Sequence, residues 1–341
     1  MSVFVIAEAG ANHDRDFKQA TALIDVAVEA GADAVKFQTY SSDTLYAKGT
    51  PDFAGYENIN ELIESIELPR EWQRDLKSYC DDTGIEFMST PFDERAVDEL
   101  YDIGVKRFKI AGFESTDPRV VRYVAETKLP LVISAGIGCD IRMIESILGW
   151  VKSVNPDPDV TFLHCNNAYP TPLEDINLEQ ITKIKSMDCG EEIKVGLSDH
   201  TEGIFVPPLA VALGAECIEK HFTLDRALPG PDHGFAVEPQ ELNQMVADIR
   251  KATLARGTKR TTGISSSEAE FVFARRSVVA SKKIQEGQLI TKDNVTTKRP
   301  CVKNSIPAHK YYDILDYDIL ATRPIEEDEI LKWGDIKSLW P

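Results

Sequence analysis

Short apolar runs rich in β-branched residues alternate with longer stretches of helical periodicity through the first 257 residues. Runs of this length and composition are typical of buried strands, so the pattern predicts eight of them. The expected strands lie at 3–10, 34–40, 85–91, 106–112, 130–136, 160–170, 193–200 and 216–223. The expected helices lie at 16–32, 69–84, 93–104, 117–128, 141–154 and 238–257.

The order of these elements predicts an α/β fold. The strands are apolar on both faces in their first halves, which is typical of a parallel sheet covered by helices. Eight β–α units within about 250 residues fit a (β/α)8 TIM barrel, and an open doubly wound sheet is the competing arrangement. We therefore expect a catalytic barrel domain over residues 1–257.

The pattern changes after the barrel region. Residues 258–275 are polar and rich in Ser and Thr, which predicts a linker. Residues 276–341 contain short strand-like runs separated by turns, which predicts a small all-β domain. A domain of that size encloses little core, so we expect it to lean on the barrel or on a partner chain.

Polar side chains collect where the predicted strands end. In a barrel of this class the loops after the strands form the active face, so these side chains are expected to share one rim. They are Glu8, Lys36, Gln38, Ser89, Thr90, Lys109, Ser134, Asn167, Tyr169, Ser198, His200 and His221.

His200 and His221 end consecutive strands and are candidate ligands for a divalent metal. The alternative is that each imidazole hydrogen-bonds a backbone carbonyl at its strand end. His233, in the sequence PGPDHG, is a possible third ligand, although such Pro- and Gly-rich runs usually form turns.

Lys36 and Lys109 indicate an anion site, because a lysine in a barrel mouth is unfavourable unless it meets an anion. The alternative is that each lysine extends to solvent. The hydroxyl groups expected beside them, for a phosphate or carboxylate, are those of Ser89, Thr90, Ser134 and Ser198.

Three acidic residues, Glu8, Glu114 and Glu219, lie near the same rim. Candidate roles are acid–base catalysis, binding of a substrate hydroxyl and support of a metal ligand. A solvated or salt-bridged carboxylate is the alternative, above all for Glu219 beside Lys220. Residues 136–142 form a weak candidate for phosphate contact at a helix start.

Composition narrows the function classes. The net charge is −18, which argues against general binding to nucleic acid or anionic membranes. The acidic excess lies within residues 1–275, whereas residues 276–341 are nearly neutral. No run is long enough to cross a membrane, and the apolar start has no basic residues before it. The six cysteines show no CxxC spacing, so we expect free thiols and a cytoplasmic protein.

Several segments together resemble the sialic acid (N-acetylneuraminate) synthase family. They are IAEAGANHD, AVKFQTY, FMSTPF, FKIAGFE, HCNNAYPTP, GLSDHT, EKHFTLD and PGPDHG. The stretch ARRSVVASKKIQEGQLITKDNVTTKRP resembles that family's antifreeze-like (SAF, β-clip) domain. The resemblance covers nearly the whole chain.

The resemblance implies condensation of phosphoenolpyruvate with an N-acylated mannosamine-type sugar, with release of phosphate. It implies that His200 and His221 bind Mn²⁺ or Mg²⁺. The catalytic residues it implies are Glu8, Lys109, Glu114 and Asp232. Phosphoenolpyruvate would be bound by Lys36, Thr90, Lys109, Ser134, Asn167 and Ser198, and the sugar by Gln38, Tyr169, Asp232 and Arg299. Arg299 would act across a domain-swapped homodimer.

Some positions depart from the family pattern and bear on the substrate. Phe113 and Phe37 replace smaller or more polar residues, which favours relatives that make pseudaminic or legionaminic acid. The PGPDH sequence favours sialic or legionaminic acid enzymes. N-acetylmannosamine is the first expected substrate, and a 6-deoxy diacetamido hexose is the alternative. Competing classes are a phosphate-releasing aldolase or isomerase and a non-catalytic sugar-binding or coat-polysaccharide assembly protein.

Overall fold

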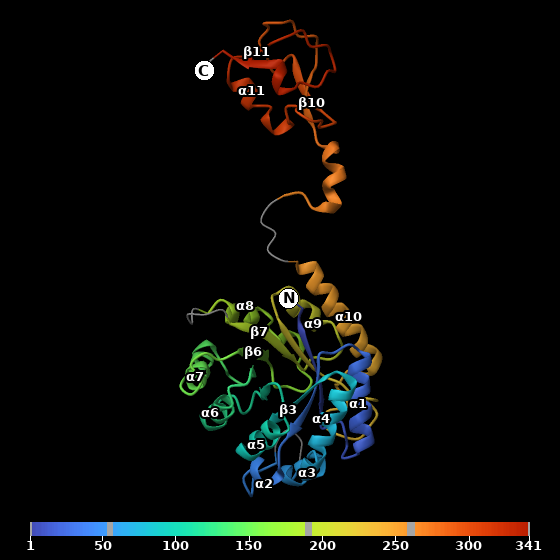
Figure 1. Cartoon of the computed structure of the whole chain (residues 1–341), viewed down its shortest axis with the longest axis vertical. Helices are drawn as coiled ribbons and strands as arrows, with labels where there is room; N and C mark the ends of the chain where they lie inside the picture. Colours follow the sequence, from blue (N-terminus) through green and yellow to red (C-terminus); the bar gives the residue numbers. More distant parts are fainter. Residues whose placement is uncertain (1, 53–56, 188–192, 258–262, 340–341) are drawn as a thin grey trace. The chain divides into compact units, whose positions relative to one another are not determined.

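A computed structural model of the chain describes residues 2–52, 57–187, 193–257 and 263–339. The chain separates into two compact units, Met1–Thr258 and Lys259–Pro341, which are described in turn (Figure 1). The expected linker begins with residues 258–262, which lie outside the described residues. Its later part forms a 3-10 helix, η3 (Ser266–Ala274), where the sequence predicted irregular structure.

The first unit is built around eight parallel strands that follow the ring order β3-β2-β1-β8-β7-β6-β5-β4. The end strands β3 and β4 lie beside each other, so the sheet closes into the expected barrel. The predicted (β/α)8 architecture is confirmed, and the open doubly wound sheet is excluded. The strands are β1 (Phe4–Gly10), β2 (Ala34–Thr39), β3 (Glu86–Pro91), β4 (Phe108–Ile110), β5 (Leu131–Ala135), β6 (Val160–Cys165), β7 (Lys194–Asp199) and β8 (Cys217–His221).

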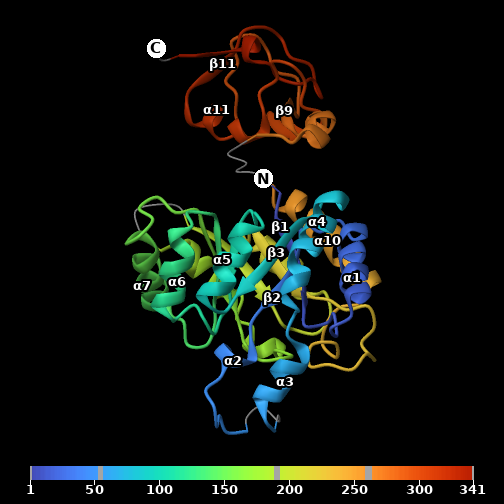
Figure 2. The ribbon, with the colours of Figure 1, turned by 60° about the horizontal axis from the view of Figure 1, so that its bottom comes forward.

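Helices surround this sheet (Figure 2). Several begin where an aspartate caps free backbone N–H groups, as Asp16, Asp93, Asp117 and Asp140 do. The helices are α1 (Phe17–Glu29), α2 (Ser42–Leu45), α3 (Ile59–Ile66), η1 (Arg70–Trp72), α4 (Gln73–Thr83), α5 (Glu94–Asp102), α6 (Pro118–Glu126), α7 (Ile141–Lys152), η2 (Leu173–Asp175), α8 (Glu179–Lys185), α9 (Val206–Ala212) and α10 (Pro239–Arg256).

The short helices α2 and α3 were not expected from the sequence. They are inserted between β2 and α4 and project beyond the surrounding helices in Figure 2. Their apolar residues pack in a cluster of their own around Tyr40, Ile59 and Ile63. This cluster is separate from the large core between the strands and the outer helices. It consequently adds an apolar wall beside the carboxyl ends of β2 and β3.

The second unit has its own apolar core, which includes Val278, Ile306 and Leu331. Its short strands form two antiparallel pairs, as expected for a small β domain. They are β9 (Ser277–Ala280) with β10 (Val295–Lys298) and β11 (Ile319–Ala321) with β12 (Ile336–Ser338). Short turns of helix connect them, namely η4 (Ala308–Lys310), α11 (Asp313–Asp316) and η5 (Trp333–Asp335). Among the described residues of both units, no helix combines the length and apolarity that a membrane crossing requires.

Close packing inside the barrel predicts that Gly196→Ala strongly destabilises the fold. A Cβ atom added there would lie 2.1 Å from the carbonyl oxygen of Cys217, which is backbone and cannot move aside. We expect a loss of about 2 to 3 kcal/mol in the free energy of unfolding, measured by urea denaturation followed by circular dichroism. Gly149→Ala in α7 is the control, because its Cβ meets nothing within 4 Å. It should stabilise the barrel by about 0.5 to 1 kcal/mol. Equal stability of the two variants would contradict this packing.

Candidate active site

A cavity of about 360 Å³ opens at the carboxyl ends of the barrel strands. Its volume lies in the range of small-molecule sites. The cavity brings together nearly all of the site residues predicted from the sequence. Those that line it are Glu8, Lys36, Gln38, Lys109, Glu114, Ser134, Asn167, Tyr169, Ser198, His200, His221 and Asp232.

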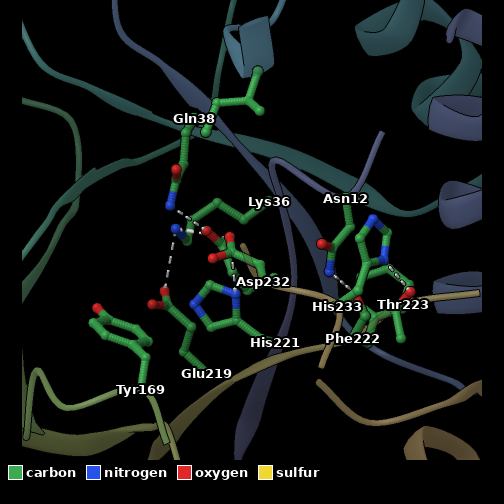
Figure 3. A network of polar contacts seen from close by, with 12 residues as sticks. Asn12, Lys36, Gln38, Tyr169, Glu219, His221, Phe222, Thr223, Asp232 and His233 are labelled. Atoms are coloured by element: carbon green, nitrogen blue, oxygen red, sulfur yellow. Dashed lines mark hydrogen bonds and ion pairs between the residues drawn. The ribbon is translucent and has the colours of Figure 1, made fainter. Parts of the chain in front are cut away.

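Glu8 and Lys36 form a buried ion pair on the cavity floor. The Lys36 Nζ atom lies 2.7 Å from Glu8 Oε2 and donates to Thr90 Oγ1 at 3.0 Å. The Gln38 side-chain amide donates to the other oxygen of Glu8 at 2.9 Å (Figure 3). The pair is positioned by strand register, since Glu8 on β1 is opposite Lys36 on β2. Thr90 is thus one of the hydroxyl groups that the sequence placed beside the lysines, and the structure shows it in contact with Lys36.

Glu219 connects this pair to the second lysine. Its carboxylate lies 3.8 Å from Lys36 Nζ and 3.4 Å from Lys109 Nζ, and it accepts a hydrogen bond from Ser198. Lys109 Nζ also donates to Ser134 Oγ at 2.8 Å. The sequence left the role of Glu219 open between a functional and a salt-bridged carboxylate. In the structure it is the centre of the charged floor.

The two glutamates of the floor differ in acidity. Burial raises the pKa of Glu8 to about 7, although the nearby Lys36 opposes the shift. Burial alone would also raise the pKa of Glu219, but the charges of Lys109 and Lys36 outweigh it and lower that pKa. Near neutral pH, Glu219 is thus ionised while Glu8 is close to its titration point. One group can exchange a proton while the other stays an anion.

His200 and His221 lie side by side at the rim, with ring centroids 5.4 Å apart. The backbone carbonyl of Asn166 accepts from His200 Nδ1 at 2.6 Å, which leaves Nε2 of that ring unprotonated and available. The Nδ1 atom of His221 is buried without a hydrogen-bond partner. Burial lowers the pKa of His200 to about 4 and that of His221 well below its usual value. Both rings are consequently neutral, as metal ligation requires.

Asp232 approaches this pair from the loop after β8. Its Oδ2 atom lies 3.7 Å from His221 Nδ1, and its carboxylate accepts from the backbone N–H of Ala11. Gly10 permits this approach, because a Cβ atom there would lie 2.9 Å from Asp232 Oδ2. Within the described parts of the chain, no three His, Cys, Asp or Glu side chains already form a metal-binding group.

His233 does not join the pair, so its prediction as a third ligand is wrong. Its ring contacts Thr223 Oγ1 at 2.7 Å (Figure 3). On the other side the ring lies 3.0 Å from Asp14 Oδ1. It connects the loop after β8 to the loop after β1. By this contact it holds the segment that carries Asp232.

A second buried ion pair lies on the opposite face of β7 and β8. Lys220 Nζ donates to Asp199 Oδ2 at 2.7 Å, and both side chains are almost fully buried. These residues directly precede His221 and His200 in the sequence. The pair ties together the two strand ends that carry the imidazoles.

Asn167 and Tyr169 close another side of the cavity. The backbone N–H of Ile137 donates to Asn167 Oδ1, and the ring of Tyr169 packs on His200 with centroids 4.2 Å apart. A Cβ atom on Gly136 would lie 2.0 Å from Asn167 Oδ1, so any larger residue there would displace the Asn167 side chain. Of the segment 136–142, residues 136–141 line a neighbouring cavity of about 660 Å³.

Two predicted contributions are not found in the cavity. Ser89 is on the outer face of β3, where its hydroxyl is 2.7 Å from Thr39 Oγ1. Phe37 is fully buried among the outer helices and stacks with Phe87, so it touches no substrate site. Both errors have one cause, because side chains of a strand alternate between its two faces. Phe113, in contrast, lines the cavity and is 55% exposed.

Arg299 belongs to the second unit, just after β10. Its expected role at a partner's site stays a prediction. Cys165 is buried, and burial raises the pKa of its thiol to about 11, in keeping with a packing role.

Comparison with known proteins places the chain among sugar-acid synthases. Residues 23–261 match the model described as the NeuB family, and residues 275–337 match the SAF domain. The N,N'-diacetyllegionaminic acid synthase of Legionella pneumophila is 39% identical over 88% of this chain and 86% of its own. A pseudaminic acid synthase of Campylobacter jejuni is 36% identical over 98% of this chain and 97% of its own.

A solved structure gives the same result. The N-acetylneuraminic acid (sialic acid) synthetase of Leptospira borgpetersenii, in complex with citrate, is 34% identical with a TM-score of 0.72. The match covers 80% of this chain and 90% of that one. The resemblance that the sequence motifs indicated is thereby confirmed, including the SAF domain.

Glu114 allows a prediction on stability against pH. Burial raises its pKa to about 7, and its Oε2 atom has no hydrogen-bond partner in the described structure. Because the folded protein holds this proton more tightly than the unfolded chain, the group lowers stability as pH rises from 4.5 to 7. Glu114→Gln should therefore stabilise the protein above pH 7 by about 1 to 3 kcal/mol and have little effect below pH 4.5. Thermal melts across this range test it, and a constant difference would contradict the assignment.

Proposed function

Since the chain belongs to the NeuB family of nonulosonic acid synthases, we propose that it condenses phosphoenolpyruvate with an N-acylated mannosamine-type sugar and releases phosphate. The observation that carries this proposal is the cavity floor. Two buried lysines, Lys36 and Lys109, stand there beside two neutral imidazoles. A trianionic substrate needs such cations, and an aldehyde that becomes an alkoxide needs stabilisation of developing charge.

Phosphoenolpyruvate would bind through the two lysines and the groups around them. Ser134 and Ser198 line the cavity and contact Lys109 and Glu219, so their hydroxyls are within reach of the same ligand. Thr90 does not line the cavity and would act through Lys36, from which it accepts a hydrogen bond. Asn167 adds an amide at the side of the cavity. In the free protein the single carboxylate of Glu219 lies near both lysines. A bound phosphate or carboxylate would compete for them and strengthen their hydrogen bonds.

A divalent metal, Mn²⁺ or Mg²⁺, fits the rim. The unpartnered Nδ1 atom of His221 and the free Nε2 atom of His200 are suitable ligands, and Asp232 is close enough to support them. Water and substrate oxygens would complete the shell, since two imidazoles alone do not. Such an ion supplies Lewis acidity at the sugar aldehyde.

The reaction joins two carbons and breaks one carbon–oxygen bond. C3 of phosphoenolpyruvate attacks the aldehyde carbon of the open-chain sugar, water adds at C2, and the tetrahedral intermediate expels phosphate. Glu8 or Glu114, each with a pKa near 7, accepts one proton of that water and passes it to the alkoxide oxygen formed from the aldehyde, while the other proton leaves with the phosphate. Gln38, Tyr169 and Asp232 line the cavity where the sugar hydroxyls would lie.

The sugar is defined by this chemistry only at its reacting end. N-acetylmannosamine, which gives N-acetylneuraminate, and the 6-deoxy diacetamido hexoses both carry the required aldehyde and acylamino group. The sequence motifs are divided, since PGPDH favours sialic or legionaminic acid enzymes and Phe113 favours pseudaminic or legionaminic acid enzymes. One structural observation, the apolar side of the cavity, favours the second. The alternative of a non-catalytic sugar-binding protein predicts no turnover with either.

The direct test is phosphate release from phosphoenolpyruvate with each sugar, scored together with the product mass. The proposal expects release only when both substrates and Mn²⁺ are present. His221→Ala should lower turnover by at least about 100-fold and weaken Mn²⁺ binding measured by calorimetry. His309→Ala, which removes an imidazole in the second unit, is the control and should bind Mn²⁺ normally. Release of phosphate without any sugar would point instead to a phosphatase or another phosphate-releasing enzyme.

We also infer that the family's domain-swapped homodimer brings Arg299 of one chain to the barrel of its partner. Arg299→Ala should then raise KM for the sugar more than KM for phosphoenolpyruvate. A mixture of Arg299→Ala and His221→Ala chains should regain activity, because a mixed dimer has one barrel with His221 and one intact Arg299 to serve it. Failure of such mixtures to regain activity, although mixed dimers form, would contradict the exchange.

A further inference from the structure

The backbone ladder between β7 and β8 ends just before the two imidazoles. The last pair of its register in the described structure is Asp199 with Lys220. His200 follows the end of β7, and His221 is the last residue of β8. Backbone hydrogen bonds between these two strands consequently do not set the distance between the two rings.

Each histidine takes its support from a different neighbour. His221 is opposite Glu8 on β1. The backbone carbonyl of His200 accepts from the N–H of Thr171 at 2.9 Å and its ring is bound to the carbonyl of Asn166, so its support comes from the segment after β6. A small shift between β1 and that segment would therefore change the distance between the imidazoles.

The ion pair of Asp199 and Lys220 spans this gap. Lys220 Nζ donates to Asp199 Oδ2 at 2.7 Å and also to the backbone carbonyl of Thr201. The other carboxylate oxygen, Asp199 Oδ1, accepts from the hydroxyl of Thr201 at 2.9 Å and from its N–H at 3.1 Å. The pair thus holds the residues on both sides of His200 and the residue directly before His221.

The burial of this pair indicates what it contributes. Asp199 and Lys220 are 0% and 1% exposed, and neither belongs to the residues that line the cavity. A buried ion pair gives little net stability compared with apolar side chains of the same volume, and its best-attested use is to fix a register. Because neither side chain faces the cavity, any effect on the reaction has to pass through the residues beside them.

We propose that Asp199 and Lys220 are positioning residues that fix the spacing of the two histidine rings and thereby set the affinity of the rim for a divalent cation. This inference rests on the proposed condensation, in which His200 and His221 bind Mn²⁺ or Mg²⁺. Partners behind metal ligands typically contribute about 10- to 100-fold to metal affinity, because they hold the ligand atoms in the required geometry. Here one ion pair serves both ligands.

A charge-neutral double variant tests the proposal. Asp199→Asn with Lys220→Met removes both charges together, so no unpaired charge is left in the interior, and the amide oxygen can still accept from Thr201. We expect Mn²⁺ to bind about 10- to 100-fold more weakly, measured by calorimetry. Phosphoenolpyruvate binding without metal should change by less than about twofold, because Lys36 and Lys109 lie on β2 and β4.

The matched control breaks an ion pair at the other end of the same strand. Lys185 on α8 contacts Glu216, which directly precedes β8, at 2.6 Å. Glu216→Gln with Lys185→Met makes the same change of charge and should alter Mn²⁺ affinity by less than about twofold. Melting temperatures of both double variants report any general loss of stability.

Cobalt gives a readout of the ligand atoms themselves. The visible absorption of bound Co²⁺ depends on the number and arrangement of its ligands, so the Asp199→Asn, Lys220→Met protein should show a changed spectrum and the control an unchanged one. A loss of stability alone would leave the spectrum of the folded protein as it is. If the double variant does not fold, Asp199→Asn alone takes its place, with Mn²⁺ binding expected to be about 10-fold weaker.

Three results would overturn the inference. Unchanged Mn²⁺ affinity in the folded variant would do so and leave the condensation standing. Equal weakening in the control would mean that β8 as a whole, and not this ion pair, positions the rings. Absence of Mn²⁺ binding to the unmodified protein would overturn both the inference and the proposed metal site.

Discussion

The site depends on four ionisable side chains, two glutamates and two lysines, that are buried together on the cavity floor. Glu8, Lys36, Lys109 and Glu219 are 1%, 2%, 2% and 4% exposed. A single unpaired charge in such a place costs several kcal/mol, so the chain is stable only if β1, β2, β4 and β8 hold these groups in contact. Strand register achieves this, because Glu8 is opposite both Lys36 on β2 and His221 on β8. Closure of the barrel and pairing of the buried charges therefore depend on each other.

Successive side chains of a strand point to opposite faces, and this alternation separates the residues of the cavity from those that fix the strands. On β8, Glu219 and His221 point inward to the floor and rim, while Lys220 between them points outward to Asp199. The inner face thus performs the chemistry, and the outer face fixes the strand ends that carry it. The net charge of −18 consequently says little about the ligand. A local pair of lysines decides which anion the cavity attracts, although the surrounding shell is acidic.

Periodicity predicted the strands, most helices and the shared rim, because buried parallel strands leave a clear apolar signal. It did not predict α2, α3, α8 or α9, and the apolar side of the cavity was missed with the first two. The helix α2 has only four residues, too few for a helical period, whereas α3 was missed although its apolar residues have helical spacing. Ser89 and Phe37 were expected at the cavity because they lie near strand ends, but both point to the outer face of their strands. Glu219 remained ambiguous because its neighbour Lys220 suggested a local ion pair. The strand in fact separates the two residues onto opposite faces.

The central claim is that the charged floor is the phosphoenolpyruvate site. Calorimetric binding of phosphoenolpyruvate to the unmodified protein and to Lys109→Met, without sugar, tests it most directly, with circular dichroism to confirm folding. The account predicts binding to the unmodified protein and binding about 10- to 100-fold weaker to the folded variant, because a charge-assisted contact is lost. Equal affinity of the two proteins would contradict it.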